Sequence, residues 1–167
     1  MKITLDNIDR RIIALLQEDG SLSIADLAKK LHMTTPPCWR RVRRLKDAGV
    51  LERQVWLVNG ASIGFNAYVY AAIKLATHDS QAVLRFRERI KAWPEVLECY
   101  VLLGAIDVLV KIVVPDIQFY EDFFFKKLSQ LPGVREVNSS VVMSEIKKTT
   151  KLPANERGGS QPARACD

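Results

Sequence analysis

The sequence has 167 residues, of which 48% are hydrophobic, enough for one compact domain or two small ones but too few for a large multidomain enzyme. The 25 basic residues outnumber the 19 acidic residues, and the formal net charge of +6 favours polyanionic partners. There is neither an apolar run of about 18 residues nor a signal-peptide pattern at the start. We therefore expect a cytoplasmic protein without a membrane segment.

The residues typical of metal sites and catalysis are sparse. Cys38, Cys99 and Cys166 are far apart and lie in no CxxC pattern, so we expect reduced thiols and no metal. The sequence contains no phosphate-binding glycine loop, no HExxH and no GxSxG motif, and only two histidines. We expect a protein that is not an enzyme and has no cofactor, apart from a candidate small-molecule effector discussed below.

The first 60 residues carry 11 basic and 7 acidic side chains and predict three helices. Asp6 can cap a helix that ends at Gly20, because apolar residues recur between them at three- and four-residue spacing. A second helix begins after Ser23, with Asp26 placed as in a capping box.

A third helix is predicted from Thr34 to about Ala48, because a threonine cap followed by prolines starts a helix without losing a needed hydrogen bond. Its apolar positions share one face, so the basic side chains project from the core, with Arg41 at the margin of that set. Five basic residues fall within seven positions: Arg40, Arg41, Arg43, Arg44 and Lys46. A short helix, a tight turn and a basic helix predict a helix-turn-helix.

Beyond the third helix, Val50 to Asn59 predicts a short hairpin, the wing, and Asn59-Gly60 a turn between domains. The remaining pattern is βαββαβ. The expected strands are 67–75, 96–103, 107–114 and 134–143, and the expected helices are 80–93 and 116–130. The fold class is thus α+β: a winged helix-turn-helix domain (1–60), a ferredoxin-like domain (61–152) and a disordered tail (153–167).

Several motifs occur in the order and spacing of one family. They are Leu5-Asp6-Asn7-Ile8-Asp9, Leu27-Ala28-Lys29-Lys30-Leu31, the run from Pro37 to Leu45, Ala48-Gly49-Val50-Leu51, Pro94 to Tyr100, Gly104-x-x-Asp107, Leu131-Pro132-Gly133-Val134 and Lys148-Thr149-Thr150-x-Leu152-Pro153. On these motifs, residues 3–153 resemble the Lrp/AsnC family of bacterial and archaeal transcription regulators, also called feast/famine regulators.

The resemblance implies an N-terminal domain that binds double-stranded DNA, in a cytoplasmic, nucleoid-associated protein. It also implies a C-terminal domain that forms homodimers, often assembled into octamers, and that binds an amino acid between dimers. His32 stands where the family usually has glycine in the turn between helices. We therefore predict a positive φ at His32, because histidine is among the residues enriched there.

The candidate DNA-binding residues lie at the start of the second helix and along the third: Ser23, Thr34, Thr35, Trp39, Arg40, Arg41, Arg43, Arg44 and Lys46. A charge run is often only a solvated face. Here the arginines follow a capped turn, where they can pair with phosphates or read guanine. We assign most of them to phosphates and Thr35, Trp39 and Arg40 to base edges, since the start of a recognition helix enters the major groove.

Two neighbours in this helix have alternative interpretations. An aromatic residue beside Cys38 more often packs in the core than contacts a ligand, and we favour packing for Trp39. Cys38 lies on the inward face. The alternative hypothesis makes it a redox sensor whose thiol pKa is lowered by the flanking arginines.

The candidate effector-binding residues are Leu103, Gly104, Ala105, Ile106 and Asp107 in one loop, and Ser139 and Ser140 on the last strand. Asp107 can cap the turn by accepting backbone N–H groups. It can also bind an effector's ammonium group, or hold the loop amides in place for the effector's carboxylate, and the resemblance favours these roles. The two serines can equally be exposed strand residues.

Together these features predict a sequence-specific DNA-binding transcription regulator whose assembly or DNA affinity responds to an amino acid. The alternative is an amino-acid-responsive architectural protein that wraps DNA with little sequence specificity. An RNA-binding module is disfavoured, because no strand carries the aromatic pair that stacks bases.

Overall fold

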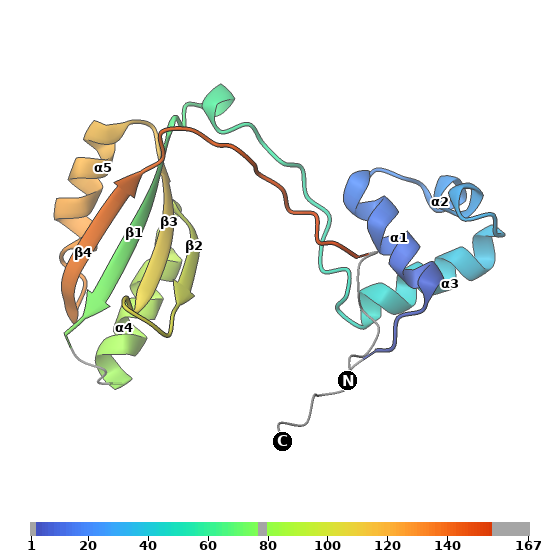
Figure 1. Ribbon diagram of the computed structural model, residues 1–167, viewed down its shortest axis with the longest axis horizontal. Helices are drawn as coiled ribbons and strands as arrows, with labels where there is room; N and C mark the ends of the chain where they lie inside the picture. The colour runs from blue at the N-terminus through green and yellow to red at the C-terminus, as the bar shows by residue number, and fades with distance from the viewer. Residues whose placement is uncertain (1–2, 77–79, 155–167) are drawn as a thin grey trace, which may run out of the picture. The chain divides into compact units, whose positions relative to one another are not determined.

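The computed structural model describes residues 3–76 and 80–154, which belong to two compact units (Figure 1). The first unit takes in residues 1–56 and 147–167, and the second is 57–146. From residue 155 onward, the predicted tail lies outside the described residues. Within the described parts of the chain, no helix has the length and apolar character needed to cross a bilayer.

The first unit contains three helices: α1 (Asn7–Glu18), α2 (Ile24–Lys30) and α3 (Thr35–Asp47). The Asp6 side chain accepts a hydrogen bond from the Asp9 amide (2.8 Å) and the Asp9 side chain accepts one from the Asp6 amide (3.1 Å), completing a capping box. Ser23 caps α2 by accepting from the Asp26 amide. The turn between α2 and α3 has φ 53° at His32, as predicted.

Side chains from all three helices close a small apolar core. Its fully buried members include Ile12 from α1, Leu27 from α2 and Leu45 from α3. Burial of this kind is the main favourable contribution to folding, and here it fixes how the three helices pack together.

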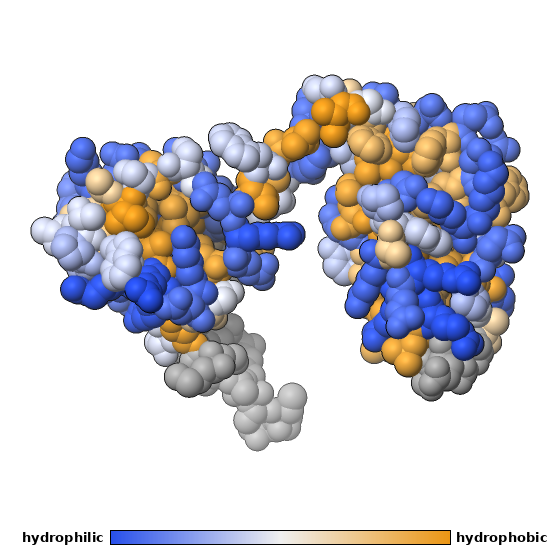
Figure 2. All heavy atoms as spheres, turned by 180° about the vertical axis from the view of Figure 1, so that it is seen from behind, coloured by the Kyte–Doolittle hydropathy of each residue, from blue (hydrophilic) through white to orange (hydrophobic). Residues whose placement is uncertain are grey.

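The predicted wing is wrong. Residues 52–59 carry no strand assignment and no hairpin. The run Val55–Val58 has the composition of a strand, but all four side chains are exposed and no strand of the described chain pairs with it. These hydrophobic side chains gather along the connecting segment in Figure 2. The turn at Asn59 does form, since its side-chain oxygen accepts from the Ala61 amide (3.1 Å).

The second unit has the predicted βαββαβ order. Its strands are β1 (Ala67–Leu75), β2 (Val96–Val101), β3 (Val108–Val114) and β4 (Val134–Val141), and its helices are α4 (Ser80–Ala92) and α5 (Ile117–Phe123), the latter continued by a π-helical turn, Phe124–Leu128. Short η1 (Ala61–Ile63) precedes β1. The sheet order is β2-β3-β1-β4 and every pair is antiparallel, so β1 is central.

The two helices cover one face of the sheet. Phe86 and Ile90 of α4 and Phe123 of α5 pack on alternate residues of β1 and β3, among them Val69 and Val110. Because side chains alternate along a strand, the intervening residues form the open face. This open sheet face comprises Tyr68, Tyr70, Leu109, Lys111, Tyr100 and Glu98, which pair across the strands.

A C-terminal segment belongs to the first unit. The Leu152 amide donates to the side-chain oxygen of Gln17 (2.7 Å), and the Gln17 side-chain nitrogen donates to the Leu152 carbonyl (3.1 Å). Lys151 forms an ion pair with Glu18. The side chain of Gln17 therefore binds the backbone of Leu152 through both of its polar atoms, and residues 151–154 dock on α1.

We predict that a chain ending at Ile146 has a less stable first unit than one ending at Ala154. The shorter chain loses both Gln17 hydrogen bonds, each worth about 1 kcal/mol, and an exposed ion pair worth less. Its unfolding free energy is expected to fall by about 1–2 kcal/mol, measured by urea unfolding followed by circular dichroism. The chain ending at Ala154 keeps these contacts and is the control. Equal midpoints for the two chains would contradict the docking.

Candidate nucleic-acid interface and effector loop

Helix α3 has an inward and an outward face. Cys38, Val42 and Leu45 are buried, and the side chains at positions 39, 40, 43 and 46 are exposed. Thr34 and Thr35 are exposed at the start of α3, and Ser23 is exposed at the start of α2. The helix therefore presents four exposed cations away from its buried residues: Arg40, Arg43, Arg44 and Lys46.

Trp39 lies on the surface, and the packing interpretation is wrong. The side chain is 47% exposed, because it follows Cys38 by one residue and helix positions one apart point about 100° away from each other. The guanidinium carbon of Arg43 lies 5.2 Å from the centre of its ring, a cation–π distance. Trp39 is thus placed to orient Arg43.

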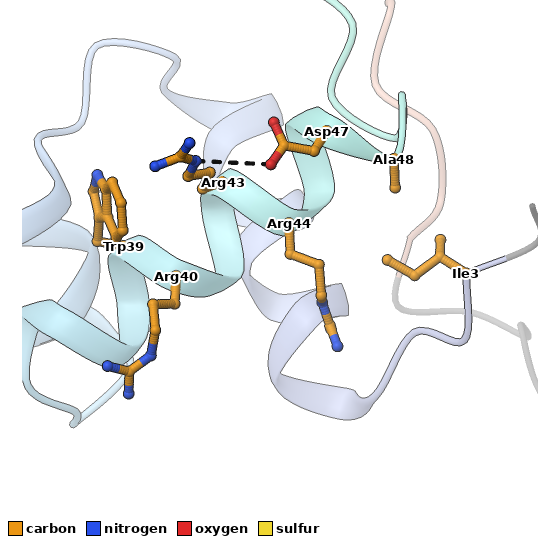
Figure 3. A pocket seen from close by; sticks show the side chains of 7 residues that line it. All are labelled: Ile3, Trp39, Arg40, Arg43, Arg44, Asp47 and Ala48. Carbon is orange, nitrogen blue, oxygen red and sulfur yellow. Dashed lines mark ion pairs between the residues drawn. The ribbon is translucent and has the colours of Figure 1, made fainter.

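Arg43 is held from both sides. The Arg43 Nε lies 3.7 Å from Oδ2 of Asp47, one helical turn further on, and in Figure 3 the Arg43 guanidinium lies between Trp39 and Asp47. An open groove of about 630 Å³ lies here, lined by Ile3, Trp39, Arg40, Arg43, Arg44, Asp47 and Ala48. Its lining is mainly cationic and aromatic, which suits phosphates and base edges.

Arg41 and Arg44 have a different environment. Arg41 lies 2.6 Å from an Asp6 oxygen and 2.9 Å from an Asp9 oxygen, and Arg44 binds the other Asp9 oxygen. The Asp9 amide and the Arg41 side chain both bond the Asp6 carboxylate and lower its pKa. The carboxylates in turn raise the pKa of Arg41. Arg41 and Arg44 are therefore paired with carboxylates near the start of α1, whereas Arg43 contacts Trp39 and Asp47 of its own helix.

Cys38 is fully buried, and burial raises the pKa of its thiol. The redox-sensor hypothesis required a lowered pKa and an accessible sulfur, so it is wrong. In the described parts of the chain, no cluster of three or more histidine, cysteine, aspartate or glutamate residues could hold a metal ion.

The candidate effector loop joins β2 to β3. Residues 103–105 are exposed, and Leu103 is fully so. The Asp107 carboxylate accepts a hydrogen bond from the Leu75 amide (2.8 Å), and the Asp107 amide donates to the Ile73 carbonyl (3.0 Å). Asp107 thus caps the end of β1 and fixes the loop against it.

The two candidate serines lie apart from this loop within the chain. Ser139 and Ser140 pair with Ala71 and Tyr70 on β1, which lie about 13 Å and about 17 Å along the strand from Leu75 at about 3.3 Å per residue. They point to opposite faces of the sheet: Ser139 shares a hydrogen bond with Tyr120 of α5, and Ser140 lies on the open side. The structure brings the five loop residues together but leaves the serines elsewhere.

A helix-turn-helix with an exposed basic third helix, joined to a separate sheet domain, defines a DNA-binding transcription regulator. Residues 5–46 match the AsnC-type helix-turn-helix domain, and residues 68–152 match the Lrp/AsnC ligand binding domain. The chain belongs to the Lrp/AsnC family of transcription regulators.

Individual relatives cover nearly the whole chain. The DNA-binding transcriptional activator DecR of Escherichia coli (strain K12) is 39% identical over 149 residues, which are 89% of this chain and 98% of DecR. An AsnC family transcriptional regulator from Agrobacterium tumefaciens superposes with a TM-score of 0.86 at 38% identity, covering 90% of this chain and 98% of that one. A transcriptional regulator from Neisseria meningitidis, solved as an L-Met complex, has a TM-score of 0.87 at 32% identity, with 91% and 98% coverage.

We predict that Trp39→Ala weakens DNA binding without unfolding the domain. The exposed cation–π contact is worth about 0.5–1 kcal/mol, so the unfolding free energy changes little, whereas Arg43 loses its orientation. Trp39→Phe keeps an aromatic face and is the control. Urea unfolding and fluorescence anisotropy with labelled DNA measure the two effects. A stability loss of about 3 kcal/mol or more, typical of a buried aromatic, would restore the packing interpretation.

A second pair of variants tests the cap at Asp107. Asp107→Ala leaves the Leu75 amide without its acceptor, and we expect the unfolding free energy of the sheet unit to fall by about 1–3 kcal/mol. Asp107→Asn keeps a side-chain oxygen at that position and is expected to retain most of the stability. Denaturant unfolding distinguishes them, and equal losses in both variants would argue against the cap.

Proposed function

We propose that this regulator binds double-stranded DNA with the outward face of α3, using Trp39, Arg40, Arg43 and Lys46 together with Thr34 and Thr35. The observation that carries the proposal is the cationic and aromatic groove on that face. Arg43, aimed between Trp39 and Asp47, is suited to a base edge, since a positioned guanidinium reads guanine. Arg40 and Lys46, with no such support, are suited to phosphates.

The proposed DNA-binding species is a homodimer, formed by the open sheet face. That face carries three tyrosines and Leu109 around the Lys111–Glu98 ion pair (2.9 Å), a mixture that suits contact between copies better than contact with water. Two helix-turn-helix domains, here called heads, are related by the two-fold axis of the dimer and place their α3 helices in successive major grooves. The preferred operator is therefore a near-palindrome with half-sites about 34 Å apart.

We further propose that an amino acid binds at the loop Leu103–Asp107 and alters assembly or DNA affinity. Because Asp107 anchors the loop to the end of β1, the exposed backbone amides of the loop are held in place and can bind a carboxylate. The L-Met complex of the Neisseria meningitidis relative supports an amino acid as the ligand class. Ser139 and Ser140 can join this site only from another copy, because their own strand carries them away from the loop. The protein acts in the cytoplasm, by binding and without catalysis.

The test begins with selection of bound sequences from a random DNA pool, followed by anisotropy titrations against the selected and a scrambled duplex. We expect preference for a near-palindrome by at least a factor of about 10³. A ratio near one would favour the architectural alternative. Light scattering gives the mass of the binding species and separates a dimer from an octamer.

The same titration is repeated with each of the twenty amino acids after a thermal-shift screen, because a ligand bound only by the folded state raises its melting temperature. An amino acid that shifts both melting and DNA affinity supports the effector proposal. Melting and affinity unchanged by all twenty would overturn the effector proposal and leave the DNA-binding proposal standing.

A further inference from the structure

Asp9 is the single charged or polar residue that is fully buried among the residues whose burial is described, 3–76 and 83–154. It lies in the first turn of α1, facing α3. A buried carboxylate is strongly destabilising unless it is paired and hydrogen-bonded. Its partners therefore have little freedom to leave it.

Those partners are two arginines of the DNA-binding helix. One Asp9 oxygen accepts from Arg41 at 2.9 Å, and the other accepts from Arg44 and from the Asp6 amide. Arg41 also contacts the Asp6 carboxylate at 2.6 Å. Two carboxylates thus face two guanidiniums, and the charge of this cluster sums to zero.

The two arginines that bind Asp9 are also less exposed than Arg43. The Arg41 side chain is 27% exposed and that of Arg44 is 49%, against 64% for Arg43. Figure 3 shows Arg44 extending away from the side of the helix on which Arg43 meets Trp39 and Asp47. Arg44 lines the groove but its end is bound to Asp9, so it is the cation that the loss of Asp9 would release.

We propose that Asp9, assisted by Asp6, is a positioning residue that withdraws Arg41 and Arg44 from DNA, so that only Arg40, Arg43 and Lys46 of this helix meet the duplex. The inference rests on the proposed DNA-binding face and deepens it. It makes the acidic residues of α1 determinants of specificity: they remove two cations that would otherwise strengthen binding to any sequence.

The consequence is measurable as salt dependence. The logarithm of the binding constant falls with the logarithm of salt concentration by about 0.9 for each phosphate neutralised. Two phosphate-binding cations per DNA-binding domain, Arg40 and Lys46, give the proposed dimer a contribution of about −4 from this helix, whereas adding Arg41 and Arg44 would give about −7. The salt dependence therefore reports how many cations of α3 neutralise phosphates.

The first test is Asp9→Asn in the full chain. The substitution keeps the shape and removes the charge, which frees Arg44 in each head. We expect a slope steeper by about 2 per dimer, tighter binding to a scrambled duplex at low salt, and a smaller ratio of specific to non-specific affinity. A merely structural role would weaken binding to both duplexes with no steepening. An unchanged slope and ratio in a folded variant would overturn the proposal.

The second test does not depend on the folding of the Asp9 variant. Arg40→Gln and Lys46→Gln are each expected to flatten the slope by about 2 per dimer. Arg41→Gln and Arg44→Gln are expected to lower the melting temperature while the slope is kept. If Arg41→Gln and Arg44→Gln flatten the slope as much as the other two, the proposal is wrong. Wild-type protein without salt-dependent DNA binding would instead overturn the proposed function.

Discussion

A buried carboxylate joins the helix that begins the chain to the helix that faces DNA. Apolar packing around Ile12 and Leu45 holds α1 and α3 together, but the hydrophobic effect is not directional. The paired guanidiniums on Asp9 are directional, because a planar fork meets a carboxylate in a defined geometry. They fix the rotation of α3 about its own axis, and with it the identity of the side chains that point outward.

The sheet unit is organised by a different constraint. Central β1 pairs with β3 on one side and β4 on the other, so its end at Leu75 is the place where the loop before β3 must be anchored. Asp107 provides that anchor by accepting from the Leu75 amide. The loop before β3 is thus tied to the middle of the sheet although β2, the strand before it, lies at the edge.

Local sequence patterns predicted the elements well where a residue's own neighbours decide the outcome. The caps at Asp6 and Ser23 and the four strands follow from such patterns, whereas the positive φ at His32 follows from the resemblance to the family. The predicted wing is absent because a strand depends on a distant partner as well as on its own composition. Val55–Val58 has the composition of a strand, but no strand of the described chain pairs with it. The predicted strands 96–103 and 134–143 each end two residues early, at Val101 and Val141, where pairing stops.

The division of the arginines was beyond sequence reasoning because its cause is tertiary. Asp9 and Arg41 are 32 residues apart, and no periodicity within α3 reveals which arginines meet α1. A signal was present nonetheless, in an acid at the inward-facing third position of α1. The docking of Leu152 on Gln17, 135 residues apart, was equally invisible. Trp39 is adjacent to buried Cys38 in sequence but points away from it on the helix, so adjacency in sequence does not predict its exposure.

The same accounting of partners limits how an effector can act. The Asp107 carboxylate accepts a hydrogen bond from the Leu75 amide, and Ser139 is engaged with Tyr120. A carboxylate can accept further hydrogen bonds, so Asp107 can hold the loop and still receive a ligand's ammonium group. If Ser139 or Ser140 also contacts the ligand, that serine belongs to a second copy. Under the proposed function, such a ligand binds the assembled state better than the separate one. It can shift assembly, and DNA affinity with it, only by that difference in affinity.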